Sequence, residues 1–256
     1  MKIQLIVAIA FLTSMVGISH GAKVLHWSGE MTAGVFDDTS GNGNIGSVAG
    51  TATNAPGLVS NAIYLDGGAN TLVQNWGTAG LPTLAADTWS MNAYVKLDAP
   101  CPSWAQIYNF GSGSYDTKNR GLIGYDDPAD IRFVTSSAGE DHLWTGVLWD
   151  TGVWQMFTVT CNGSDITIYR DGAPIGTEAY NAGGGSITLA DGDQRAMVGR
   201  SGWGQRIKGL VDEFTIWDNP LNQTEIDVLA QALVPEPATM LLFGIGGLLL
   251  IRRKQA

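Results

Sequence analysis

The chain of 256 residues carries 24 acidic and 14 basic side chains, for a formal net charge of −10 at pH 7, and 34 of its residues are glycine. The acid excess argues against nucleic acid or anionic lipid as a partner, and the glycine content argues against a mainly helical fold. With only three histidines, the chain has few residues from which to build a His-rich zinc site or a Ser-His-Asp triad.

The N-terminus has the pattern of a secretory signal peptide. Lys2 precedes an apolar stretch at residues 3–16, and small residues follow it (Ser19, Gly21 and Ala22). The apolar stretch is too short for a membrane-spanning helix. We therefore assign residues 1–21 to a signal peptide, with cleavage between Ser19 and Lys23, and expect the rest of the chain to be exported.

Short segments of alternating apolar and polar residues follow, separated by clusters of Gly, Asn, Asp and Pro. We expect strands at residues 62–65, 88–97, 106–110, 120–125, 131–135, 153–161, 166–170, 186–189, 197–200 and 209–217. Many short strands with turn signals at this spacing predict an all-β sandwich or barrel. The clearest hairpin spans residues 153–175, where Asn162-Gly163 and Asp171-Gly172 supply the turns.

Cys101 and Cys161 are the only cysteines. In an exported protein two thiols favour a disulfide, and we expect one between them. Alternation places Cys161 on the same face as Phe157 and Val159, so a bridge would be buried. The alternative is two separate buried thiols.

One helix is expected near the end of the domain. Asn222 suits the N-cap and Glu225 lies three residues later, the pattern of a capping box. Ile226, Leu229 and Leu233 recur at helical spacing. We therefore expect one folded domain over residues 22–233, with a helix at its end.

The last segment, residues 234–256, has three parts. The turn-forming Pro235, Glu236 and Pro237 come first, an apolar run at residues 238–251 follows, and Arg252 and Arg253 lie near the end. A helix of 14 residues spans only about 21 Å, short of the roughly 30 Å of hydrocarbon in a bilayer. The basic end is expected to stay in the cytoplasm. A removable sorting tail explains this pattern, with an ordinary C-terminal anchor as the alternative.

This tail resembles the PEP-CTERM signal of Gram-negative bacteria in its Pro-Glu-Pro, its hydrophobic stretch and its terminal arginines. The resemblance implies an exosortase-type processing enzyme as a partner, transient insertion of the hydrophobic helix into the membrane, and a final place at the cell surface or in an extracellular matrix.

The domain resembles the LamG-like, concanavalin A-like jelly-roll family. The motifs that carry the resemblance stand in order along the chain: DTSGNGN at 38–44, AIYLDG at 62–67, WSMNAYVK at 89–96, the hairpin from WQ at 154–155 to YRDG at 169–172, and GLVDEFTIW at 209–217. The resemblance implies a two-sheet antiparallel jelly-roll sandwich. It leaves the function open, because this fold hosts lectins, adhesion modules, glycosidases and structural domains.

A glycosidase site is not expected. Glycosidases on related sandwiches place carboxylates on one face of one strand, which requires even spacing. Asp212 and Glu213 are adjacent, so simple alternation sends their side chains to opposite faces and prevents them from lining one cleft. We expect no catalytic residues and no cofactor other than a metal ion.

A structural calcium ion is predicted in the loop at residues 37–44, which is rich in the oxygen ligands that Ca²⁺ prefers. The family resemblance implies that the start of the closing strand, the motif at residues 209–217, lies close to this loop. The predicted ligands are Asp38, Asn42, Asn44 and Asp212. The alternative is that these residues only form Asx-turns and solvent contacts.

The chain has nine tryptophans. Four stand at strand positions and are expected in the core: Trp27, Trp89, Trp154 and Trp217. Others lie in or beside segments that look irregular, and exposed indoles are stacking platforms for sugar rings. We predict that Trp104, Trp144, Trp149 and Trp203 bind ligand, and that polar groups of residues 140–142 accept hydrogen bonds from sugar hydroxyls. The alternative is that loops bury these rings.

Together these patterns predict an exported, non-catalytic domain of the cell surface or matrix that binds carbohydrate, an exopolysaccharide for example, or another extracellular component. A purely structural matrix protein is the first alternative and a glycoside hydrolase-related enzyme is the second.

Overall fold

The computed structural model describes residues 21–68, 71–75, 88–112, 119–125, 130–136, 140–179, 194–199 and 206–233. The predicted signal peptide up to residue 20, the sorting tail, Trp203 and the predicted strand at 186–189 lie outside these ranges. Within them, none of the helices is long and apolar enough to cross a membrane.

The described residues form strands β1 (Lys23–Thr32), β2 (Val35–Asp38), β3 (Gly46–Ala49), β4 (Thr53–Pro56), β5 (Asn61–Asp66), β6 (Leu72–Gln74), β7 (Thr88–Leu97), β8 (Gln106–Ser112), β9 (Asn119–Tyr125), β10 (Asp130–Ser136), β11 (Glu140–Leu148), β12 (Gln155–Asn162), β13 (Asp165–Arg170), β14 (Ala173–Ala179), β15 (Gln194–Val198) and β16 (Lys208–Trp217). Helix α1 (Gln223–Ala230) and the 3₁₀ turn η1 (Gln231–Leu233) follow. This confirms the predicted all-β architecture with one short C-terminal helix.

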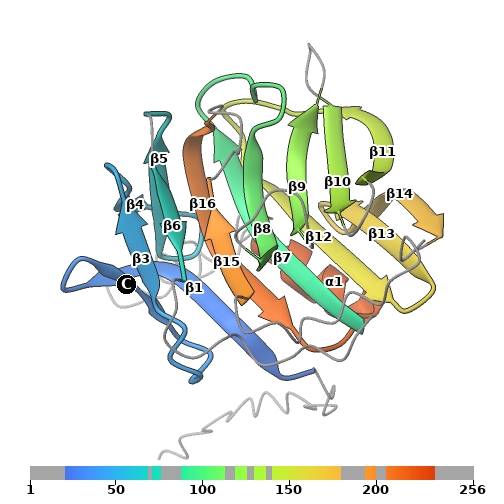
Figure 1. Cartoon of the computed structure of the whole chain (residues 1–256), viewed down its shortest axis with the longest axis horizontal. Coiled ribbons are helices and arrows are strands. Elements are labelled where there is room, and N and C mark those ends of the chain that lie inside the picture. The colour runs from blue at the N-terminus through green and yellow to red at the C-terminus, as the bar shows by residue number, and fades with distance from the viewer. Residues whose placement is uncertain are drawn as a thin grey trace, which may run out of the picture.

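Two layers pack face to face (Figure 1). The front sheet has the order β11-β10-β9-β8-β15-β6-β3-β2, and the back sheet has the order β1-β16-β7-β12-β13-β14. The pairing of β1 with β2 joins the layers, and β5 pairs with β16 and β4. The result is a nearly closed antiparallel sandwich, as the jelly-roll prediction requires.

The hairpin from β12 to β14 follows the predicted turns. The side-chain carboxamide oxygen of Asn162 accepts hydrogen bonds from the N–H groups of Ser164 and Asp165, both at 2.8 Å. Asp171 and Gly172 adopt φ values of 53° and 89°, the left-handed pair of a tight hairpin turn in which glycine is favoured. Local turn chemistry therefore sets the register of the outer strands of the back sheet.

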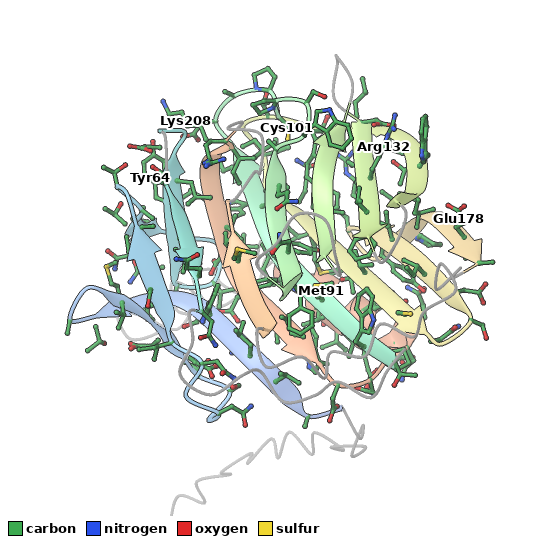
Figure 2. The ribbon with its side chains drawn as sticks, viewed as in Figure 1. Tyr64, Met91, Cys101, Arg132, Glu178 and Lys208 are labelled. Atoms are coloured by element: carbon green, nitrogen blue, oxygen red, sulfur yellow. The ribbon has the colours of Figure 1, made fainter. Side chains whose placement is uncertain are left out.

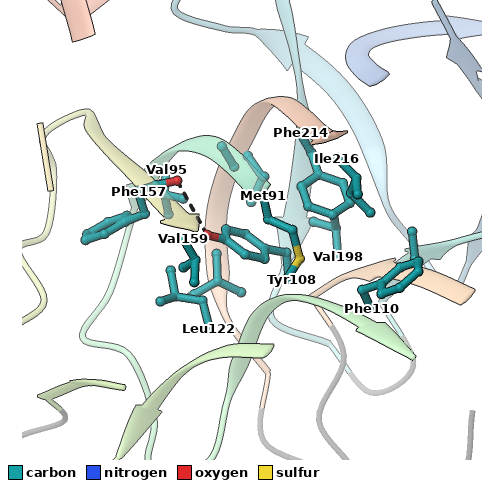
Figure 3. Packing of buried hydrophobic residues seen from close by; sticks show 14 of the residues in the cluster. Met91, Val95, Tyr108, Phe110, Leu122, Phe157, Val159, Val198, Phe214 and Ile216 are labelled. Carbon is teal, nitrogen blue, oxygen red and sulfur yellow. Dashed lines mark hydrogen bonds between the residues drawn. The ribbon is translucent and has the colours of Figure 1, made fainter. Parts of the chain in front are cut away.

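The core lies between the sheets and is built around aromatic rings. Tyr108 of the front sheet stacks on Phe214 of the back sheet with 5.2 Å between ring centroids, and Trp27 lies 5.6 Å from Phe214. Figure 3 shows the Tyr108 hydroxyl donating a hydrogen bond across the core to the carbonyl oxygen of Phe157, at 3.4 Å. Burial raises the pKa of Tyr108, so the ring stays neutral and acts as a core residue with one satisfied polar atom.

Helix α1 covers the outer face of the back sheet. A second apolar cluster forms there from Tyr94, Met156, Trp217, Leu221 and Ile226. The capping box is confirmed: Asn222 accepts from the N–H of Glu225 at 3.1 Å, and the Glu225 carboxylate accepts from the N–H of Asn222 at 2.7 Å.

The predicted disulfide between Cys101 and Cys161 is wrong. Both residues are buried and no bond joins them. Cys161 pairs with Trp89 at the start of β7, whereas Cys101 comes after Leu97 at the other end of that strand. Trp89 and Leu97 are eight residues apart in an extended strand, which corresponds to about 26 Å. A disulfide needs the two Cα atoms within about 7 Å. In Figure 2, Cys101 accordingly lies near the top of the view, well above Met91.

Candidate functional site

A row of paired strand positions crosses the front sheet. Trp144 of β11 pairs with Arg132 of β10, Arg132 with Ile123 of β9, and Ile123 with Gln106 of β8. Paired positions share a face, and the neighbours of Arg132, Ile131 and Phe133, point into the core. Arg132 and Trp144 therefore face outwards, on a row about 14 Å long.

Trp144 is the most exposed large apolar side chain among the described residues, at 61%. The guanidinium carbon of Arg132 lies 3.5 Å from its ring centroid, and Arg132 is only 2% exposed. The Asp130 carboxylate accepts a hydrogen bond from Arg132 Nε at 2.8 Å. Because one ring face rests on the guanidinium, the exposed area of Trp144 belongs to the opposite face and the edges. The indole is therefore held in place for stacking before any ligand arrives.

The next row on the same face contains Asn109, which pairs with Gly121. The Asn109 amide nitrogen donates to the side-chain oxygen of Gln106 at 2.7 Å. Its own side-chain oxygen is buried and has no hydrogen-bond partner among the described residues. A buried acceptor without a donor costs about 1–3 kcal/mol. Asn109 is only 1% exposed, so this oxygen is enclosed in the sheet and does not reach the surface.

The tryptophans predicted to bind ligand divide into different environments. Trp149 is only 8% exposed, lies 4.7 Å from Phe157 between ring centroids, and donates from Nε1 to the Asp130 carbonyl at 3.2 Å. The prediction of an exposed stacking platform is therefore wrong for Trp149, which is a core residue. Trp104 is partly buried in a loop with φ of 65°. Trp203 and the side chains of residues 140–142 lie outside the described parts of the chain.

Residues 140–148, which looked irregular in sequence, form the edge strand β11. Trp144 lies within β11 and points outwards, whereas Trp149 comes directly after the strand and packs into the core. Arg132, Gln106 and Asn109 were not predicted as site residues. The alternation of Ile131, Arg132 and Phe133 was the available signal, since it directs Arg132 away from two core residues.

The predicted calcium ligands near the N-terminus are occupied by hydrogen bonds within the protein. The Asp38 carboxylate accepts from three backbone N–H groups, those of His26, Ser40 and Asn44, at 2.9, 3.0 and 2.7 Å. The amide nitrogens of Asn42 and Asn44 donate to the carbonyl of Val24 at 3.0 and 2.9 Å. These side chains shape the loop as Asx-turns do.

Asp212 is held by a different segment. One of its oxygens accepts from the N–H groups of Leu58 and Val59 at 2.8 and 3.0 Å, and the other is buried without a partner among the described residues. Burial raises the pKa of Asp212 to about 6 against those two hydrogen bonds, and repulsion from Glu213 adds to the rise. Asp212 therefore shares no hydrogen-bond partner with the other three predicted ligands. The described residues hold no cluster of three or more His, Cys, Asp or Glu side chains that could bind a metal ion.

A β-bulge corrects the argument from alternation about Asp212 and Glu213. Asp212 pairs with Tyr94 and Thr215 with Asn92, so β16 carries one more residue than β7 in this interval. Glu213 adopts φ of 53°. The extra residue brings Asp212 and Glu213 to the same outer face. Even so, Asp212 has no exposed surface and Glu213 Oε2 lies 2.7 Å from His26 Nε2, an arrangement that holds both carboxyl groups in structural contacts.

Calcium binding remains a prediction, and melting the protein in chelator and in millimolar Ca²⁺ tests it. An ion at hundredfold excess over Kd stabilises by about 2.7 kcal/mol, or roughly 5–11 °C in a domain of this size. If the ion binds at the predicted ligands, Asp38→Ala should remove the calcium response, because Asp38 is one of those ligands. Identical curves for the wild type in chelator and in Ca²⁺ would refute a calcium site.

Two sequence families match the chain. Residues 66–227 match the concanavalin A-like lectin/glucanases superfamily, and residues 233–255 match the PEP-CTERM protein-sorting motif. No curated protein matches it in sequence.

Several solved structures share the fold. Domain 4 of AbnA, a GH43 extracellular arabinanase from Geobacillus stearothermophilus in complex with arabinotriose, is 19% identical, with a TM-score of 0.68 over 83% of this chain and 100% of that domain. The binding domain of Paraclostridial Mosquitocidal Protein 1 is 15% identical, with a TM-score of 0.62 over 82% of this chain. The binding domain of botulinum neurotoxin DC in complex with SialylT is 16% identical, with a TM-score of 0.61 over 83% of this chain. The matches span 52% of each toxin structure.

Proposed function

The chain belongs to the concanavalin A-like lectin/glucanases superfamily, and from this premise we propose that it is an exported, non-catalytic domain that binds carbohydrate through the outer face of its front sheet. The PEP-CTERM motif indicates export and exosortase-type sorting in Gram-negative bacteria, towards a surface or extracellular destination. The ligand we propose is therefore a glycan of the cell surface or the surrounding matrix.

The observation that carries this proposal is the position of Trp144. Its ring is exposed on one face and rests on the Arg132 guanidinium on the other. A rigid, exposed aromatic surface suits a sugar ring, which is apolar on its faces.

The similar domains support the ligand class but show only the fold, because each is under 25% identical. The arabinanase domain is described in complex with arabinotriose and matches over its full length. A non-catalytic role is supported by the two carboxylates of β16. Full burial keeps Asp212 from reaching a substrate, so Asp212 and Glu213 cannot act together as a glycosidase pair.

A glycan array followed by titration with the strongest oligosaccharide tests the proposal. Losing the central aromatic contact should cost about 2 kcal/mol, or roughly 30-fold in affinity, so Trp144→Ala should weaken binding by that factor. Leu148→Ala is the matched control, because Leu148 is an exposed apolar residue of the same strand. An array without saturable signals, or equal affinity for wild type and Trp144→Ala, would favour the structural-protein alternative.

A further inference from the structure

A second concave site lies on the opposite side of the sandwich from Trp144. It is a pocket of about 350 Å³ over β7 and β16, bounded by helix α1 on one side and by Lys23, near the start of the exported domain, on another. This volume is within the range of pockets that hold small ligands.

The β-bulge shapes the pocket floor. It turns Glu213 to the outer face of the back sheet, where its side chain lines the pocket. A positive φ is unusual for a residue other than glycine and is found often at functional positions. His26 fixes the carboxylate, because its Nε2 lies 2.7 Å from Glu213 Oε2 and its Nδ1 lies 2.6 Å from the Thr39 hydroxyl. The pocket thus contains an acceptor held in a defined position.

Donors and aromatic walls complete the lining. Asn92 is buried and accepts from the Thr158 hydroxyl at 2.8 Å through its side-chain oxygen, which leaves its amide nitrogen available to the pocket. Lys23 adds a second donor. Tyr94 and Trp217, both nearly fully buried, supply the aromatic surfaces.

This combination of one acceptor, two donors and two aromatic rings favours one class of ligand. A simple cation would leave the donors of Asn92 and Lys23 without acceptors, and an anion would be repelled by Glu213. A hydroxyl-rich neutral molecule can donate to Glu213, accept from Asn92 and Lys23, and lay an apolar face on an aromatic ring. The pocket volume suits a single sugar residue rather than a chain.

We propose that this pocket binds one sugar residue, so that the domain contacts glycans from two opposite faces. The idea of two glycan sites in one domain rests on the proposed function, because the front-face site around Trp144 is the first of the two. A protein with both sites can bridge two glycan chains, which gives it a cross-linking role at a surface or in a matrix.

The pocket mouth offers a substitution that blocks it without touching the polar lining. Val228 of helix α1 lines the pocket and is 47% exposed, so Val228→Trp should fill the opening and leave the fold intact. Val153→Trp is the matched control, because Val153 is 51% exposed and is not among the pocket residues. Equal melting temperatures of the two variants verify that both are folded.

The experiment measures binding of methyl glycosides of glucose, galactose, mannose, arabinose and N-acetylglucosamine by saturation-transfer NMR, in a Trp144→Ala background that removes the front site. At least one glycoside should bind saturably, with affinity lowered at least tenfold by Val228→Trp and unchanged by Val153→Trp. Absence of binding by all five glycosides in that background, or binding that survives Val228→Trp, would overturn the pocket proposal. Array binding by the wild type that is lost with Val228→Trp but not with Trp144→Ala would instead overturn the front-face proposal and support the pocket.

Discussion

Replacing Trp149 with alanine should lower the free energy of unfolding by about 3–5 kcal/mol, the range for removal of a large aromatic side chain from a core. The ring is almost fully buried against Phe157, and its Nε1 donates to the Asp130 carbonyl. The loss corresponds to roughly 6–20 °C in melting temperature for a domain of this size. Chemical denaturation of the variant and the wild type measures it directly.

Trp144→Ala is the matched control for this prediction. Trp144 is exposed and lies on the same strand segment that leads to Trp149. Removing an exposed side chain changes stability by about 0.5 kcal/mol or less. The two variants should therefore separate stability from binding: Trp149→Ala unfolds easily, whereas Trp144→Ala stays folded and loses its glycan. Equal stability of the two variants would mean that Trp149 is not a core residue.

Asp212 should make the protein less stable as the pH rises from 4 to 7. The folded-state pKa is raised from 3.8 to about 6 by burial. A raised carboxyl pKa means that folding favours the protonated form, so the stabilisation is complete below pH 4 and is lost as the pH passes 6. A rise of this size corresponds to about 3 kcal/mol. In chelator, the wild type should lose that amount relative to Asp212→Asn between pH 4 and pH 7, as urea denaturation at each pH can show.

Asp66 provides a control of opposite sign. Hydrogen bonds from the hydroxyls of Thr51 and Thr71 and from the N–H of Gly68 lower the pKa of Asp66 to about 2. Its stabilising contribution is present above pH 4 and is lost only as the pH falls towards 2. The stability difference between wild type and Asp66→Asn should therefore stay constant from pH 4 to 7. Parallel curves for wild type and Asp212→Asn over the same interval would contradict the burial argument.

Much of the local structure could be predicted from the sequence because it depends on near neighbours. The strand at residues 88–97 was predicted with the bounds that β7 has. The Asn222 capping box and the Asn162-Gly163 turn are confirmed by their hydrogen bonds. Alternation, capping and turn formation are all decided within a few residues, and the ordered motifs that they produce carry the family resemblance.

The site depends instead on contacts between distant segments. Nothing local distinguishes Trp144 from Trp149, since only the pairing of β11 with Arg132 decides which ring faces solvent. One extra residue in β16 was enough to bring Asp212 and Glu213 to the same face, because a bulge interrupts the two-residue period on which alternation relies. The two cysteines likewise lie far apart because Cys161 pairs with Trp89 at one end of β7, whereas Cys101 follows Leu97 at the other end. The sequence by itself determined many of the strands, the turns, the helix cap and the family. The tertiary structure decided which side chains meet and which are exposed, because register and bulges are set by partners far away in the chain.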